Sequence, residues 1–313
     1  MSNDEDRNER VIRARQQMRK GVYILPSLIT ITNIYAGFYS VVEALKGYKY
    51  MGLHNIDMAA HHFNIAAMCI GWAVLCDFLD GRVARMMNAT SDFGVELDSL
   101  ADVLSFGIAP AVLAYTWGFG GALPGFEKLA WGVSFMYLIC GALRLARFNV
   151  QAHKPAPPPD PTGAPSKKYF VGLPIPAAAG LIAAIIHFAP WPIPYKLTNT
   201  SVMNVNLSLS GDIYAVFLLT LVATLSLLMV STFKFQSLKS NNPSPGRSPI
   251  LTIVGIAMLI FLISSYSEWT LLIIATLYAV QGPLGKVLSL FRRKSGATVA
   301  EDPLLKLKPN QPN

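Results

Sequence analysis

Two acidic stretches that lie close together in the chain decide the fold: DFLDGRVAR at residues 77–85 and DFGVELDSLAD at residues 92–102. The first ends an apolar block over residues 63–86, and the second opens another over residues 93–117. Because only a short polar turn joins the blocks, the two helices must run antiparallel and side by side. The pattern predicts a helical hairpin that carries its acidic residues at one end.

The composition places this hairpin in a membrane. Of the 313 residues, 52% are hydrophobic and 14% are charged, whereas a soluble domain has roughly a quarter of its residues charged. A helix of about 20 apolar residues crosses the hydrocarbon core of a bilayer. We therefore predict an all-α membrane protein with about eight transmembrane helices. The predicted spans are residues 22–45, 63–86, 93–117, 129–150, 171–190, 212–232, 250–266 and 269–290.

The basic residues orient these spans. If the first span runs from the inside to the outside, every Lys and Arg except Lys46, Lys49, Lys128 and Lys196 falls on the inner side. Cytoplasmic loops carry such an excess of positive charge. Both termini and the acidic end of the hairpin are therefore expected in the cytoplasm. This distribution also accounts for the net charge of +8 without a nucleic-acid partner.

We divide the chain into four parts: a basic cytoplasmic tail over residues 1–21, a transmembrane core with the acidic site over 22–240, two additional C-terminal transmembrane helices over 241–291, and a cytoplasmic tail over 292–313. The first tail has no apolar segment, so it is not a signal peptide; we expect it to be amphipathic or disordered. The three cysteines lie inside apolar blocks, which indicates buried thiols and no disulfide framework.

Helix geometry gathers the aspartates on two faces. Asp77 and Asp80 are three residues apart, and Asp98 and Asp102 are four apart, so each pair shares one face of its helix. If the two faces meet, four carboxylates converge near the membrane surface and repel one another. Divalent cations relieve this repulsion, and carboxylate oxygens suit Mg²⁺ or Mn²⁺. Two such ions match the arrangement of two-metal phosphoryl-transfer sites.

Small residues and an arginine surround the acidic faces. Gly81, Ala84 and Gly94 leave the faces unobstructed, so that a bulky headgroup can lie against the backbone. Arg85 supplies a planar cation for a phosphate or nucleotide oxygen. A single aspartate at a helix end is commonly just solvated, but ionisable residues within membrane helices favour a functional site.

The spacing of these residues resembles the signature of the CDP-alcohol phosphotransferase family at every fixed position. The matching pattern is Asp77-x₂-Asp80-Gly81-x₂-Ala84-Arg85-x₈-Gly94-x₃-Asp98-x₃-Asp102. Other stretches extend the resemblance over residues 22–240, among them LPSLIT at 25–30, ALRLARFN at 142–149 and GLPIPAA at 172–178. Many members carry Asn where this chain has Ser27. The resemblance implies a six-helix core that displaces CMP from a CDP-linked lipid or alcohol by attack of a hydroxyl group.

The resemblance also implies roles for the four aspartates. Asp77, Asp80 and Asp98 would hold one metal ion, and Asp77, Asp98 and Asp102 the other. Asp102 would also be the general base that takes the proton of the attacking hydroxyl.

The CDP group would contact the residues between the aspartates. The resemblance assigns this role to Gly81, Ala84 and Arg85. Thr30 and Asn33 lie one turn apart in the first span, where they either line the same headgroup pocket or bond a neighbouring helix.

The acceptor site is expected near the end of the fourth span. Arg144, Arg147 and Asn149 lie there, and Lys234 follows the sixth span. These residues either bind the acceptor's carboxylate or a lipid phosphate, or they are ordinary positive charges on the cytoplasmic side. The first reading follows chiefly from the resemblance.

Within the family, the chain is most similar to members that transfer the phosphatidyl group of CDP-diacylglycerol to L-serine, which gives phosphatidylserine and CMP. An alternative is another acceptor, such as choline, inositol or glycerol phosphate. A cation-coupled transporter is disfavoured because such ion sites usually lie near the bilayer midplane. An intramembrane aspartyl protease would need only a pair of aspartates that share a proton. We further expect a homodimer among membrane lipids.

Overall fold

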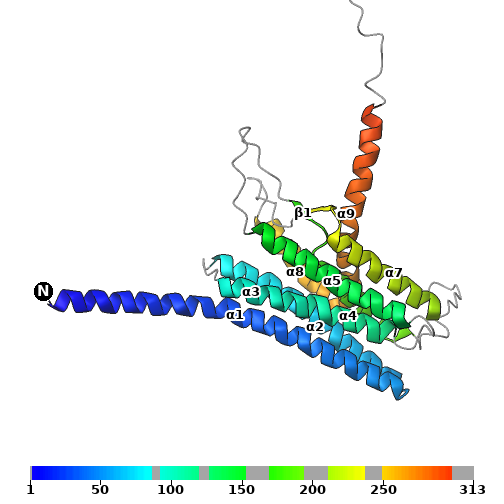
Figure 1. Cartoon of the computed structure of the whole chain (residues 1–313), viewed down its shortest axis with the longest axis horizontal. Helices are drawn as coiled ribbons and strands as arrows, with labels where there is room; N and C mark the ends of the chain where they lie inside the picture. Colours follow the sequence, from blue (N-terminus) through cyan, green and yellow to red (C-terminus); the bar gives the residue numbers. More distant parts are fainter. Residues whose placement is uncertain are drawn as a thin grey trace, which may run out of the picture.

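The computed structural model describes residues 2–86, 92–119, 127–152, 169–193, 211–236 and 249–297. Figure 1 shows a bundle of helices with a small two-stranded sheet at its edge. The α-helices are α1 (Ser2–Gly52), α2 (Ile56–Met86), α3 (Asp92–Asp102), α4 (Ala109–Ala114), α5 (Glu127–Ala152), α6 (Ile175–Phe188), α7 (Gly211–Val230), α8 (Pro249–Ser265) and α9 (Ser267–Ala297). The π-helical segments are η1 (Val103–Ile108) and η2 (Tyr115–Phe119), and the antiparallel strands are β1 (Tyr169–Val171) and β2 (Lys234–Gln236).

Five helical segments are long and apolar enough to cross a membrane: Ser27–Gly52, Ile56–Val83, Phe93–Phe119, Glu127–Gln151 and Ile213–Val230. They coincide with the first four predicted spans and the sixth. The fifth, seventh and eighth predicted spans coincide with α6, α8 and α9, which are not among these five. The prediction of an all-α membrane protein is confirmed, although two three-residue strands are added to it. The total of eight spans stays a prediction.

The fifth predicted span begins differently from the expectation. Its first residue, Val171, belongs to β1, and α6 starts only at Ile175 and has 14 residues. Proline fits the first turn of a helix but not its interior, and Pro174 is the N-terminal cap of α6. Gly172 lies between β1 and α6, and its φ angle is +85°. A Cβ at this residue would lie 2.3 Å from the carbonyl oxygen of Met229, so this turn requires glycine.

Helix α1 also differs from the expectation at its beginning. It starts at Ser2, so the backbone of the predicted tail is helical over residues 2–21 and continuous with the first span. Residues 2–20 contain no Gly or Pro and include many Arg and Gln, which favour helix. Figure 1 shows this part of α1 projecting away from the bundle.

Small residues let α1 and α2 pack closely. A Cβ on Gly47 would lie 2.8 Å from the ring of Phe63. The Ser40 hydroxyl donates a hydrogen bond of 2.8 Å to the carbonyl of Ala66. In a bilayer, close packing and hydrogen bonds of this kind hold helices together, because lipid tails are as apolar as the side chains.

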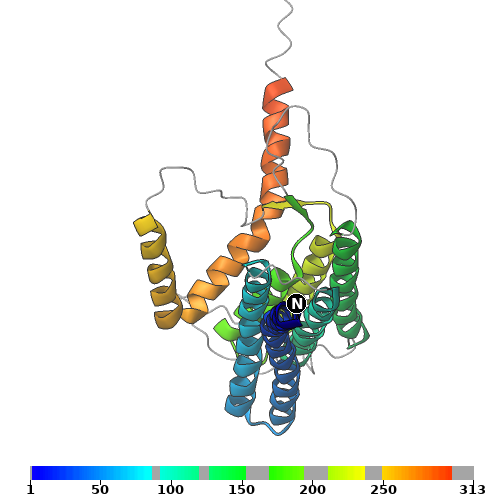
Figure 2. The same cartoon turned by 90° about the vertical axis from the view of Figure 1, so that its left-hand side faces the viewer.

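The last two helices are arranged unlike the others. Figure 2 shows α8 set apart from the bundle and α9 crossing obliquely beside it. Among the described residues, α8 packs chiefly against α9, and α9 packs along α6 and reaches β2. The C-terminal pair is therefore attached to the core through α9.

Candidate active site

Three aspartates converge at one end of the bundle. Asp77 of α2 and Asp98 and Asp102 of α3 each offer a carboxylate oxygen, and these oxygens lie within 4.8 Å of one another. Helices α2 and α3 pack far more extensively against α1 than against each other. Helix α1 therefore supports both of the helices that carry these carboxylates.

The fourth aspartate, Asp80, has a different neighbour. It is 5% exposed, and its Oδ2 atom accepts a hydrogen bond of 3.3 Å from the hydroxyl of Thr30 on α1. Its charge still acts on the other three, since Asp80 interacts electrostatically with Asp77, Asp98 and Asp102. The structure therefore brings together three of the predicted metal ligands and holds the fourth beside them through α1.

Two of the carboxylates each have an oxygen atom without a partner among the described residues. The Oδ1 atoms of Asp98 and Asp102 are buried and accept no hydrogen bond from the described residues. Burying an unpaired carboxylate oxygen costs free energy, and adjacent like charges add to this cost. Hard oxygen ligands at such separations fit a divalent cation. The donor set therefore fits the metal ions that the sequence predicted.

A π-helical segment follows Asp102 directly and is clamped on two sides. The Ser105 hydroxyl donates to the Asn33 carbonyl of α1 at 2.9 Å, and the Tyr137 hydroxyl of α5 donates to the Phe106 carbonyl at 3.2 Å. A Cβ on Gly37 would lie 2.3 Å from the Ser105 Oγ atom, so glycine permits this approach of α1. π-helical turns occur frequently at functional sites. Here the clamped segment holds the end of α3, where Asp102 lies.

The side chain of Asn33 is buried inside the bundle, and its predicted contact with CDP stays a prediction. It is fully buried, and neither of its amide atoms bonds to a described residue. Thr30, one turn earlier, is 5% exposed and bonds to Asp80. Of these two polar residues, Thr30 is the one whose side chain contacts an aspartate.

One of the predicted acceptor residues, Arg144, interacts with an aspartate. Its guanidinium interacts electrostatically with Asp102, and its Nε atom is buried without a hydrogen bond to a described residue. Asn149 instead donates to the Ser99 hydroxyl of α3 at 2.8 Å, and Arg147 is exposed. The three residues of this helix end thus have three different surroundings.

Several predicted residues are described only in part. Gly81 is half-buried on α2, and Gly94 is half-buried on α3. The side chains of Ala84, Arg85 and Lys234 lie outside the described residues. Their predicted contacts with CDP and with phosphate stay predictions.

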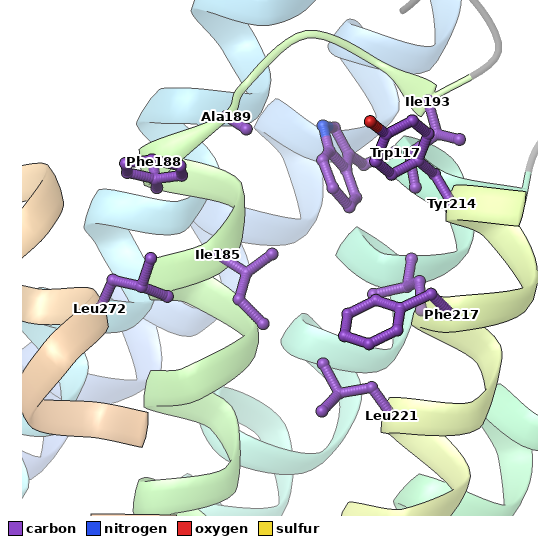
Figure 3. Close-up of a pocket in the computed structure, with 10 residues that line it drawn as sticks. Trp117, Ile185, Phe188, Ala189, Ile193, Tyr214, Phe217, Leu221 and Leu272 are labelled. Atoms are coloured by element: carbon purple, nitrogen blue, oxygen red, sulfur yellow. The ribbon is translucent and has the colours of Figure 1, made fainter. Parts of the chain in front are cut away.

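A cavity of about 180 Å³ lies at the opposite end of the bundle (Figure 3). Trp117, Phe188, Tyr214 and Phe217 surround it with aliphatic residues of α6, α7 and α9. The Trp117 Nε1 atom already donates to the Pro190 carbonyl at 3.1 Å. Fifteen helical residues separate Asp102 from Trp117, which corresponds to roughly 22 Å. This apolar cavity offers no carboxylate or cation, so we place the reaction at the aspartates.

A second charged cluster near that opposite end was not predicted. Glu43 of α1 is 2% exposed and accepts hydrogen bonds from Lys46 at 2.7 Å and His62 at 2.6 Å. The sequence pattern did not indicate this cluster, because Glu43 falls inside an apolar block. Lys46, three residues later, was a usable signal, since residues three apart on a helix pair readily.

The fold and the site define an integral membrane protein with a cluster of carboxylates, whose donor set fits a divalent cation, at one end of its bundle. Residues 23–210 match the model of the CDP-alcohol phosphatidyltransferase family, and the chain belongs to this family. The matched range includes all four aspartates and ends before α7.

Curated relatives share its sequence over parts of their length. The CDP-diacylglycerol–serine O-phosphatidyltransferase of Saccharomyces cerevisiae is 42% identical over 159 residues, which are 51% of this chain and 52% of that protein. The protein of the same name from Helicobacter pylori is 32% identical over 219 residues, 70% of this chain and 74% of that protein. The protein of the same name from Bacillus subtilis is 36% identical over 169 residues, which are 54% of this chain and 78% of that protein. The match thus spans about half of the yeast relative.

Proposed function

We propose that this protein transfers the phosphatidyl group of CDP-diacylglycerol to the hydroxyl group of L-serine, which produces phosphatidylserine and CMP. The observation that carries the proposal is the convergence of Asp77, Asp98 and Asp102 within 4.8 Å, in a chain of the CDP-alcohol phosphatidyltransferase family. The relatives named for this reaction support L-serine as the acceptor. Arg144, a cation beside Asp102, suits an acceptor that carries a carboxylate.

Asp77, Asp80, Asp98 and Asp102 would hold two divalent ions, Mg²⁺ or Mn²⁺. When bound, such ions neutralise the charge that develops on the diphosphate. The substrate's nucleotide would lie against Gly81 and Ala84, with Arg85 and Thr30 at its phosphates.

The chain's own residues would handle the acceptor. Asp102 takes the proton of the serine hydroxyl as the serine oxygen bonds to the phosphorus that carries diacylglycerol. The bond from that phosphorus to the bridging oxygen breaks, and CMP leaves with the electron pair. Asp102 suits the role of base because its carboxylate is buried, lies close to those of Asp77 and Asp98, and interacts with Arg144. Arg144 would hold the serine carboxylate, with Arg147, Asn149 and Lys234 nearby on the same side.

The proposed orientation of the protein in the membrane follows from the distribution of its basic residues. The aspartate end would face the cytoplasm, where serine and CTP-derived nucleotides are soluble, and both termini would lie on that side. CDP-diacylglycerol would reach the site from the surrounding lipid. The proposed unit in the membrane is a homodimer.

The test uses the purified full chain in lipid vesicles with CDP-diacylglycerol, L-serine and Mn²⁺ or Mg²⁺. We expect CMP release that depends on serine, with phosphatidylserine formed in equal amount. A chelator of divalent ions should abolish both, and re-addition of Mn²⁺ should restore them. If CMP release is faster with inositol, glycerol phosphate or choline than with serine, the proposed acceptor is wrong. Activity that persists in excess chelator would refute the metal site.

A further inference from the structure

Asn149, near the end of α5, bonds to the helix that carries two of the converging aspartates. Its Nδ2 atom donates a hydrogen bond of 2.8 Å to the hydroxyl oxygen of Ser99 on α3. The Ser99 hydroxyl in turn donates to the Val95 carbonyl of α3 at 3.0 Å. Because this hydroxyl both accepts and donates, it is a well-defined attachment point on α3 for the Asn149 amide.

Helix α3 has little other contact with α5. Among the described residues, α3 packs chiefly against α1 and continues into η1, whereas its backbone packing against α5 is slight. A helix of 11 residues that packs along one neighbour can still rotate against it. Hydrogen bonds between polar side chains are one of the interactions that hold membrane helices together. The bond from Asn149 to Ser99 therefore restricts the rotation of α3.

A second hydrogen bond attaches the following segment to the same helix. The Tyr137 hydroxyl of α5 donates to the Phe106 carbonyl of η1 at 3.2 Å, so α5 holds α3 and η1 at two points. Asp102 lies between these points, three residues after Ser99 and four before Phe106, and Asp98 directly precedes Ser99. Residues that bond next to metal ligands orient those ligands. The two attachments are placed to do this for both aspartates.

We propose that Asn149 is a positioning residue for the metal site: through Ser99 it holds α3 in the rotation at which the metal ligands of this helix face Asp77. This inference rests on the metal site of the proposed function. The three carboxylate oxygens lie within 4.8 Å of one another, and a rotation of α3 would displace two of them at once. Asn149 thereby acts on the cation site rather than as a ligand of the acceptor, because its amide donor is engaged with α3.

The test is a double-mutant cycle with Ser99→Ala and Asn149→Leu in the purified full chain in lipid vesicles. Mn²⁺ binding is measured without substrate, from the electron paramagnetic resonance signal of the free ion. Loss of the hydrogen bond should raise the Kd for Mn²⁺ about fivefold in either variant. The double variant should show no larger increase, because both substitutions remove the same bond. At saturating Mn²⁺, the KM for L-serine should stay unchanged.

Two further variants serve as controls. Ser99→Thr keeps the hydroxyl and should retain the Mn²⁺ affinity of the wild-type protein. Ser264→Ala removes a serine hydroxyl that bonds to the Phe261 carbonyl of its own helix, α8, and should leave the Kd unchanged.

A higher KM for serine with unchanged Mn²⁺ affinity in Asn149→Leu would make Asn149 a ligand of the acceptor and overturn the inference. An unchanged Kd in Ser99→Ala, or effects that multiply in the double variant, would also overturn it. Because Mn²⁺ binding is measured without substrate, failure of the reaction is detected separately. A wild-type protein that binds Mn²⁺ but shows no serine-dependent CMP release would refute the proposed function, so the two failures are distinguishable.

Discussion

Glu43 and Asp102 are both buried carboxylates in membrane-spanning helices, towards opposite ends of the bundle, but their surroundings differ. Glu43 accepts hydrogen bonds from Lys46 and His62, so both of its oxygens have donors. Asp102 has two further carboxylates within 4.8 Å, and its Oδ1 atom bonds to no described residue. The hydrogen-bonding capacity of the Glu43 carboxylate is met by side chains of the protein, whereas the Asp102 carboxylate lies in a cluster with excess negative charge.

This difference separates a structural charge from a functional one. A buried ion pair with all of its hydrogen bonds made stabilises one helix arrangement, whereas an unpaired buried charge is tolerated only where something else compensates it. An acidic residue inside a membrane helix is therefore a weak indicator of a site. Several such residues with unsatisfied oxygens are a stronger one.

The largest expected effect is that of Asp102→Asn. The substitution keeps the size of the side chain but removes the proposed base and one proposed metal ligand, so CMP release should fall about 10³-fold. The measurement is single-turnover CMP release at saturating Mn²⁺, with thermal unfolding as a check that the fold is retained. Near-normal turnover in this variant would contradict the functional difference between Asp102 and Glu43.

The converse experiment is Glu43→Gln at the other end. The neutral amide leaves Lys46 and His62 without their carboxylate, which should lower the free energy of unfolding by about 2 kcal/mol. The Mn²⁺ dependence of CMP release should stay unchanged, because this cluster does not contact the aspartates. A shifted Mn²⁺ requirement in a folded variant would contradict the structural role of Glu43.

A smaller effect is expected from Thr30→Val, which removes the hydroxyl that donates to Asp80. Asp80 then lacks this donor, and turnover should fall about fivefold, together with weaker activation by Mn²⁺. The control is Thr220→Val on α7, where the hydroxyl bonds to its own helix at Val216. Equal losses in the two variants would mean that Thr30 has no specific connection to the site.

The smallest effect concerns the clamp on η1. Ser105→Ala removes the hydrogen bond to the Asn33 carbonyl, which contributes about 1 kcal/mol. We expect a several-fold higher Mn²⁺ concentration for half-maximal activity, because η1 holds the end of α3 that carries Asp102. Ser226→Ala, a buried serine that bonds only within α7 at Val222, should leave this concentration unchanged. If both variants behave alike, the clamp does not position Asp102.

Local spacing was sufficient for much of the site. Intervals of three and four residues place Asp77 with Asp80 and Asp98 with Asp102 on single helix faces, whatever the remainder of the chain does. Long apolar blocks likewise predict membrane helices, because the bilayer leaves backbone groups no other partner than the helix itself. Five predicted spans and the family were therefore accessible without coordinates.

Distances between elements were not accessible in this way. The sequence predicted four converging carboxylates, but the rotation of α2 and α3 about α1 decides that three meet and that Asp80 turns towards Thr30. The pairing of Glu43 with His62, nineteen residues away, depends equally on how α1 and α2 pack. Helix-internal patterns carry no information on such lateral contacts.

The sequence by itself therefore determined the class of protein, the acidic hairpin and its chemistry, because these depend on composition and on the helical repeat. Only the tertiary structure decided which buried charges are satisfied, where the π-helical segments lie, and that α9 packs along α6. The physical reason is that helix packing adjusts rotation and depth as a whole, through contacts between residues far apart in the chain.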